Sequence, residues 1–171
     1  KGLFLRAVAF LGKSGLSVVD ARIHTTSHGW ALDTFVANDA FGKFASSDSL
    51  RKLERDFAAA LTNGKPLPPA PKCRLSRRSR HFPTRPSVQI QPDEAGRAFI
   101  LNIVATDRLG LLYAISKVLA KYDVNLQTAK LATLGERAED VFLIDGAALH
   151  DDATLLQLEA ELIEALLPKS N

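Results

Sequence analysis

The sequence contains very little sulfur, with one cysteine (Cys73) and no methionine in 171 residues. A single cysteine excludes an internal disulfide framework and leaves too few thiolates for a structural zinc site. No apolar run reaches the roughly 20 residues that a transmembrane helix requires, and no signal-peptide pattern opens the chain. We therefore expect no membrane partner and a reducing, cytoplasmic setting.

Motifs of catalysis are also missing. The sequence has no nucleophile elbow, P-loop, Rossmann fingerprint or paired Ser/Cys–His arrangement. The acidic residues Glu136, Glu139 and Asp140 have no histidine beside them, which favours charged turn and strand residues over metal ligands or a catalytic pair. The histidines lack the close spacing of a metal site: His24, His28, His81 and His150. We predict no catalytic residue, no metal and no cofactor for this chain.

The excess of positive over negative charge is confined to one segment. Six of the 22 Lys and Arg residues lie between Lys72 and Arg85, where no acidic residue occurs. Four prolines precede that stretch, and it lacks the series of aromatic residues on which nucleic-acid bases stack. This composition favours an extended, solvated linker over a nucleic-acid-binding patch, so we do not expect nucleic acid as a partner.

An internal repeat organises the chain. Gly2 and Leu3 align with Gly110 and Leu111, and the match continues as far as Thr25 and Thr133. Each copy opens with an apolar stripe at helical spacing, formed by Leu3, Phe4, Ala7, Phe10 and Leu11 and by Leu111, Leu112, Ile115, Val118, Leu119 and Tyr122. We predict an amphipathic helix in each copy, the first spanning residues 2–14 and ending at Gly15.

Two strands and a second helix follow in each copy. The apolar alternation slips by one residue after Val18 and again after Leu126, which predicts a β-bulge or a strong twist at the same place in both copies. The next strands are expected at about Trp30–Ala37 and Ala138–Ile144, after turns at 27–29 and 134–136. Closing helices are predicted over Leu50–Leu61 and Leu155–Leu166, with N-caps at Ser47 or Asp48 and at Asp151 or Asp152.

Two further strands, Ser87–Gln91 and Arg97–Ala105, precede the second copy and flank a turn at 92–96. In a ferredoxin-like sheet the last strand lies beside the first, and the strand at 87–91 can fill that slot. We therefore predict an α+β chain of two ferredoxin-like domains, each an antiparallel sheet with two helices on one face. The first domain (1–64) lacks its first strand, residues 65–86 form the linker, and the second domain (87–171) is permuted. Because the chain starts at Lys1 rather than Met, we expect a piece of a longer protein.

Short motifs resemble the ACT domain family. The turn Asp107-Arg108-Leu109-Gly110-Leu111-Leu112 is similar to the family's Asp-Arg-Pro-Gly-Leu-Leu, although Leu109 replaces the proline, and Val124-Asn125-Leu126 is similar to its Val-Asn-Ile. Residues 133–142, 20–26 and 31–35 resemble the C-terminal tandem ACT region of bacterial PII uridylyltransferases, and this resemblance covers nearly the whole chain.

The resemblance implies a regulatory module that senses glutamine and controls nitrogen-assimilation signalling. It implies a longer Mg-dependent, UTP-using nucleotidyltransferase with a phosphohydrolase activity, which acts on the PII signalling protein. Physical reasoning alone favours a small zwitterion without choosing glutamine. The competing hypothesis is a ligand-independent module that pairs with other ACT units, including those of a second copy.

The candidate ligand site is centred on Gly110. Glycine lets backbone N–H groups approach a ligand closely, and a helix N-terminus suits an amino-acid carboxylate. Asp107 either caps this helix or faces the ligand's ammonium group, Asn125 binds the ligand or its own backbone, and Gly110 also fits a simple turn. The candidate residues are Asp107, Arg108, Leu109, Gly110, Leu111, Leu112, Asn125 and Leu126, with the first-copy equivalents Gly2, Leu3, Ser17 and Val18.

A salt link is the expected role of two aligned acidic residues. Asp33 in the first copy aligns with Asp140 in the second. Across the hairpin, Arg22 and Lys130 are the basic residues that we expect to pair with them.

Overall fold

The computed structural model describes residues 2–23, 32–39, 41–62 and 84–167. These ranges do not include the predicted turn at 27–29, most of the predicted linker, Cys73 or three of the histidines. In the second half of the chain, five strands form one antiparallel sheet in the order β3-β4-β7-β5, with β6 paired to β7. They are β3 (Ser87–Pro92), β4 (Phe99–Thr106), β5 (Asn125–Lys130), β6 (Thr133–Leu134) and β7 (Arg137–Asp145).

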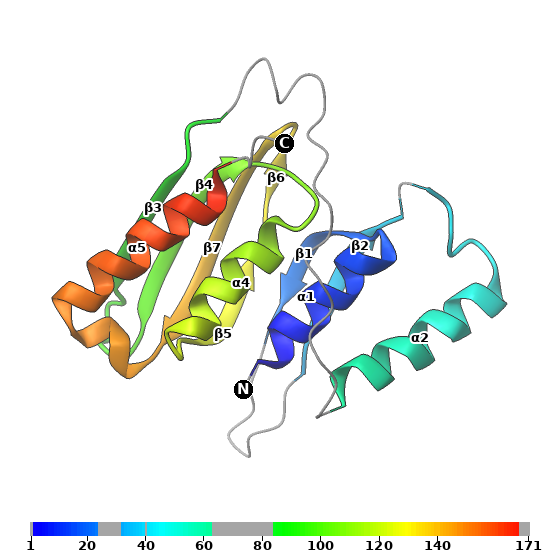
Figure 1. Ribbon diagram of the computed structural model, residues 1–171, viewed down its shortest axis with the longest axis horizontal. Helices are drawn as coiled ribbons and strands as arrows, with labels where there is room; N and C mark the ends of the chain where they lie inside the picture. Colours follow the sequence, from blue (N-terminus) through cyan, green and yellow to red (C-terminus); the bar gives the residue numbers. More distant parts are fainter. Residues whose placement is uncertain (1, 24–31, 40, 63–83, 168–171) are drawn as a thin grey trace.

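The helices of this half lie on one face of the sheet (Figure 1). They are α4 (Leu111–Lys121) and α5 (Asp152–Leu166), preceded by the short 3-10 helix η1 (Ala147–His150). The chain thus runs β4-α4-β5-β7-α5, and β3 pairs with β4 in the slot of the last ferredoxin strand. The predicted permutation is confirmed, as is the α+β class.

The core lies between this sheet and its helices. Buried and less buried residues alternate along β4 and β7, so that one face of each strand packs inward. The largest fully buried side chains come from both layers: Leu101, Ile103, Phe142 and Ile144 of the sheet, and Ile115, Leu158, Leu162 and Leu166 of the helices. This packing positions the turn before α4 at the edge of the core.

The first half repeats the same local structure. It contains α1 (Leu3–Ser14), β1 (Ser17–Arg22), β2 (Thr34–Asn38) and α2 (Ser47–Leu61). Gly2 and Gly110 are the equivalent N-caps of α1 and α4, with left-handed φ values of 78° and 84°. The register shifts between Val18 and Asp20 in β1 and at the equivalent place in β5, so the shared bulge is confirmed.

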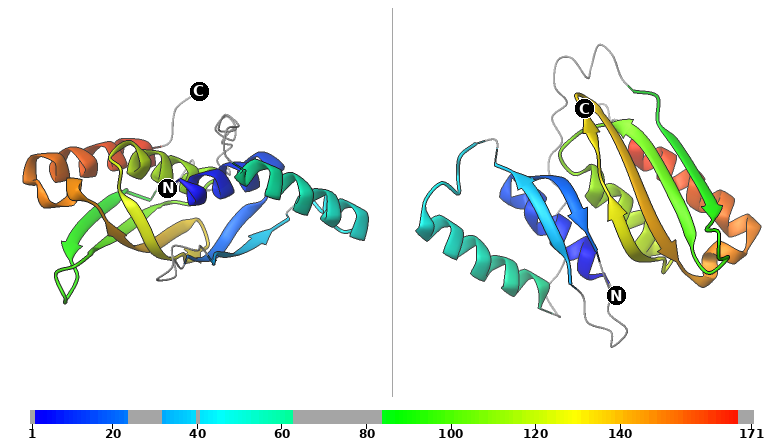
Figure 2. Two further views of the ribbon diagram at one scale, coloured as in Figure 1. Left: turned by 90° about the horizontal axis from the view of Figure 1, so that it is seen from below. Right: turned by 180° about the vertical axis from the view of Figure 1, so that it is seen from behind.

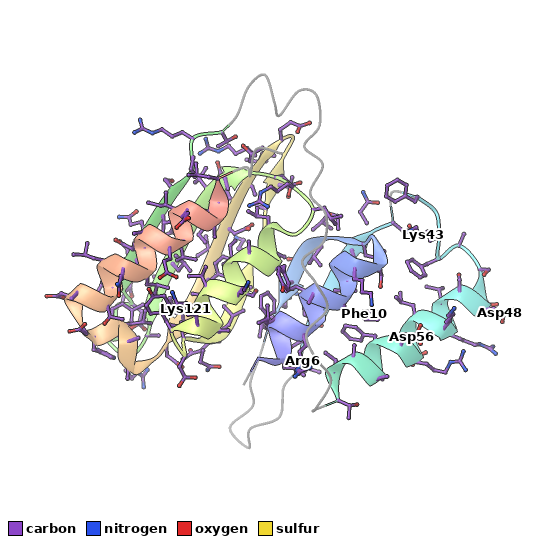
Figure 3. The ribbon with its side chains drawn as sticks, in the orientation of Figure 1. Arg6, Phe10, Lys43, Asp48, Asp56 and Lys121 are labelled. Carbon is purple, nitrogen blue, oxygen red and sulfur yellow. The ribbon has the colours of Figure 1, made fainter. Side chains whose placement is uncertain are left out.

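The first half departs from expectation at its end. Strand β2 begins at Thr34, and α2 is capped by Ser46, whose hydroxyl accepts the Ser49 N–H at 3.2 Å, rather than by Ser47 or Asp48. No residue of α2 is buried. Among the described residues its sheet has only two strands, so α2 packs against α1, where Phe57 meets Phe10 at a ring-centroid distance of 5.5 Å (Figure 3).

The two halves lie side by side. Strand β1 is next to β5, and α1 is next to α4 (Figure 2). Residues of both halves share one hydrophobic cluster, with Phe4, Leu5 and Val8 of α1 joining Leu111 and Ile115 of α4. The arrangement brings the C-terminal half of α1 close to the turn that begins α4.

The N-cap of α5 permits a matched test. Asp151 accepts the Thr154 N–H at 2.9 Å, whereas Asp152 is an exposed residue of the first turn. We expect Asp151→Ala to lower the free energy of unfolding by about 1 kcal/mol, because an orphan backbone donor loses its acceptor. Asp152→Ala should change it by less than about 0.5 kcal/mol. Urea unfolding of both variants measures the difference, and equal losses would contradict the assigned cap.

Candidate functional site

A cavity of about 40 Å³ lies where the two halves meet. One wall comes from the first half: Val8 and Gly12 of α1, then Leu16, Ser17 and Val18 leading into β1. The other comes from the second half: the turn and first residues of α4 (107–113), with Leu131, Thr133, Ala138 and Asp140. The present space holds only a few water molecules. A larger ligand therefore fits only if the walls of the cavity separate.

The turn at 107–110 presents the N-terminus of α4 to this cavity. Gly110 occupies the N-cap position with φ 84°, a conformation that L-residues with a Cβ rarely adopt. No side chain caps the helix, so the alternative in which Asp107 serves as the cap is wrong. The first N–H groups of an α-helix have no intrahelical acceptor, and they form its positive end. In α4 the first of them, that of Leu111, donates to the Arg108 carbonyl at 3.1 Å, so a ligand would use the N–H groups that follow it. This wall is suited to an anionic group.

Backbone and side-chain contacts hold the turn in place. The Asp107 N–H donates to the Glu136 carbonyl at 2.8 Å, which ties the turn to the β6–β7 connection. The Arg108 Nη2 donates to the Ala165 carbonyl at 2.6 Å, in the last turn of α5, where the helix dipole favours a cation. One nitrogen of the Arg108 guanidinium is therefore bonded to α5, whereas its Nε is buried without a hydrogen-bond partner among the described residues, and the residue lines the cavity.

Two carboxylates face the same cavity. Asp140 lies on β7 with only 4% of its surface exposed, and its Oδ1 accepts the Ala132 N–H at 3.4 Å. Burial raises its pKa to about 7, and the charge of Asp107 adds to this effect. Burial also raises the pKa of Asp107, with a further contribution from Glu136. The described part of the chain holds no salt bridge to Asp140, and Arg108 is the one cationic residue among those that line the cavity.

Asp140 is the residue whose place sequence reasoning missed. The predicted pairing with Lys130 is wrong, since Lys130 is exposed and lies opposite Val141 in the sheet. The alternation along β7 indicates the buried position of Asp140. Ala138, Phe142 and Ile144 are buried, and Asp140 lies at the same two-residue spacing. A charged side chain is expected at the surface, but the two-residue period of the strand places Asp140 on the buried face.

The structure divides the candidate residues into two groups. The turn residues of the second copy and the strand residues Ser17 and Val18 of the first copy line one cavity together. Asn125, Leu126, Gly2 and Leu3 do not line it. In the repeat, Asn125 and Leu126 are the equivalents of Ser17 and Val18, and Gly2 and Leu3 are those of Gly110 and Leu111. The turn of one copy therefore faces the strand of the other copy, and Ser17 takes the place beside the turn that was expected for Asn125.

Other site classes find little support in the part of the chain that the structure describes. No group of three or more His, Cys, Asp or Glu residues there could hold a metal ion. None of its helices has both the length and the apolar character needed to cross a membrane.

Comparison with known proteins links the chain to one enzyme. It is 50% identical over 167 residues to the bifunctional uridylyltransferase/uridylyl-removing enzyme of Chromobacterium violaceum. The aligned region covers 96% of this chain and 19% of that enzyme. The enzyme of the same name from Aromatoleum aromaticum is 45% identical, over 97% of this chain and 19% of its own length. The one from Ralstonia nicotianae is 47% identical, over 96% of this chain and 20% of its own length. The chain thus spans about a fifth of these relatives. No protein-family model matches it, and no solved structure matches it.

Proposed function

Because this chain is homologous to one segment of bifunctional uridylyltransferase/uridylyl-removing enzymes, we propose that it is a regulatory module that senses glutamine. The ligand site is the cavity between the two repeats, lined by the turn at 107–110 and by Ser17 and Val18. The observation that carries the proposal is the pairing, in one cavity, of a helix N-terminus with two carboxylates. Such a cavity complements both ends of a zwitterion.

The chemistry of the cavity sets the orientation of the ligand. The α-carboxylate would accept hydrogen bonds from the backbone N–H groups at the start of α4. The ammonium group would lie toward the carboxylates, and apolar walls that include Val8 and Leu131 would contact the methylene groups. Glutamate would bring a second carboxylate into a negatively charged space, where like charges repel, so the neutral amide of glutamine is favoured.

Sensing would operate through the arrangement of the two halves. The cavity is too small for an amino acid as it stands, so binding would select a state in which α1 and β1 lie farther from the α4 turn. A ligand shifts such an equilibrium only by its difference in affinity for the two states. Arg108 connects the turn to the last turn of α5, which gives ligand-driven movement a route to the end of the second half.

In the longer enzyme, this movement would control the addition and removal of uridylyl groups on the PII signalling protein, and so nitrogen-assimilation signalling. The Mg-dependent, UTP-using chemistry and its catalytic residues would lie outside the segment that this chain matches. The proposal therefore assigns the chain itself no cofactor and no catalytic role.

A ligand-independent interaction module is the second candidate. Exposed apolar side chains on and around β2 favour it, with Val36 half exposed and Phe41 75% exposed. Such residues would serve to pair the first half with another ACT unit, including that of a second copy.

Calorimetric titration of this chain tests the first proposal. We expect saturable heat with glutamine and none with glutamate, serine or phenylalanine. Absence of heat with all four amino acids, together with a concentration-dependent increase in molecular mass by light scattering, would instead support the interaction module.

A further inference from the structure

We propose that Asp140 is the residue that binds the ligand's ammonium group and makes the site selective for amino acids over their deaminated analogues. The inference rests on the proposed amino-acid site and adds a residue that is not among the candidate ligand-binding residues of the sequence. Asp140 lies on the inward side of β7, among the residues that line the cavity between the two halves.

The surroundings of Asp140 call for a cationic ligand. The side chain is almost fully buried, and the single hydrogen bond that it makes among the described residues is long, at 3.4 Å to the Ala132 N–H. Burying a carboxylate costs free energy unless an opposite charge or good hydrogen bonds replace the water that it loses. Arg108 is the one cation among the lining residues, but its Nη2 is bonded to the Ala165 carbonyl at 2.6 Å, and no salt bridge joins Arg108 to Asp140. A ligand ammonium would supply the missing positive charge.

The distribution of charge in the cavity also fixes the ligand's direction. The N-terminus of α4 forms a positive wall, and Asp140 with Asp107 forms a negative one. Asp107 belongs to the turn and is partly exposed, so water can screen it, whereas Asp140 is shielded from solvent. An ion pair between the ligand's ammonium group and Asp140 therefore contributes more to the preference for amino acids over deaminated analogues than one with Asp107 does.

A structural role is the competing explanation, since Asp140 also accepts the N–H of Ala132 between β5 and β6. Asp140→Asn separates the two roles, because the asparagine carbonyl keeps this acceptor and the shape of the side chain but removes the charge. Glu139→Gln is the matched control. Glu139 precedes Asp140 on β7, its side chain pairs with Arg137 at 2.5 Å, and it does not line the cavity.

The experiment compares glutamine with glutaramic acid, which is glutamine without its α-amino group, by titration calorimetry of the wild-type chain and both variants. We expect the wild type and Glu139→Gln to bind glutamine at least about tenfold more tightly than glutaramic acid. Asp140→Asn should lose about 10- to 100-fold in affinity for glutamine and little for glutaramic acid, so that the preference disappears. Thermal unfolding followed by circular dichroism verifies that each variant is folded.

Three results would overturn the inference: equal losses of both ligands in Asp140→Asn, unchanged glutamine binding in that variant, or no binding of any amino acid to the wild type. The last would overturn the sensor proposal as well. If the wild type instead binds serine or another α-amino acid and Asp140→Asn loses that affinity, the assignment to glutamine fails and the role of Asp140 stands.

Discussion

Replacing Gly110 with valine is expected to abolish glutamine binding, with an affinity loss of at least about a hundredfold. Gly110 has φ 84°, and a β-branched residue strongly disfavours this left-handed conformation. The strain would tilt the first turn of α4 and displace the N–H groups that we assign to the ligand carboxylate. Losing two such hydrogen bonds to a charged group costs about 3 kcal/mol, which corresponds to about a hundredfold in affinity. Titration calorimetry measures the loss.

The internal repeat supplies the control for this substitution. Gly2 caps α1 with φ 78°, does not line the cavity, and has open space around the position that a Cβ would occupy. Gly2→Val should therefore cost a similar amount of stability, about 1–2 kcal/mol, without affecting binding. Normal glutamine binding by Gly110→Val would disprove the placement of the ligand at this turn. A change in oligomeric mass without any binding change would favour the interaction module.

The local structure of this chain could be predicted because its signals are local. Apolar stripes at helical spacing predict α1 and α4, and the shared phase slip predicts the bulges after Val18 and Leu126. Even the permuted sheet follows from pattern, since β3 is an alternating strand that a short turn separates from β4. Each of these features depends on residues that are close together in the sequence.

The composition of the cavity could not be predicted, because it depends on how the two repeats dock. The candidate site grouped Asn125 with Gly110, and the sequence did not decide whether the two copies pair with each other or with another chain. The structure instead places Ser17 beside the turn, because α1 packs against α4 and β1 lies next to β5. Nothing in either copy alone indicates which strand will face the turn.

Two other misses have different physical causes. The apolar spacing of α2 fits a packed helix, but a helix is buried only where a surface lies beneath it, and the described part of its sheet offers two strands. Ser46 and Ser47 are equally good caps by residue type, so only backbone geometry decides between them.

Raising the pH from 5 to 8 is expected to destabilise the wild-type chain by about 2–3 kcal/mol through Asp140. The pKa of this carboxyl is raised from 3.8 to about 7 in the folded chain, so the folded state holds its proton more tightly than the unfolded state does. Between these two pKa values the folded state binds more protons, and stability falls as the pH rises until about pH 7. The raised pKa of Asp107 acts in the same direction. Urea unfolding at pH 5, 6, 7 and 8 measures the effect.

The Asp140→Asn variant isolates this contribution, because subtracting its profile removes those of the other titrating groups. Asp39, Asp93, Asp151 and Glu161 have pKa values below their ordinary 3.8 or 4.5, so their contributions are lost as the pH falls through the acidic range, mostly below this window. We expect Asp140→Asn to match the wild type near pH 5 and to exceed its stability at pH 8, where the wild type must bury a charge. Parallel profiles for the two proteins would mean that Asp140 ionises without penalty, and the cavity would then lack the unneutralised charge on which ammonium recognition depends.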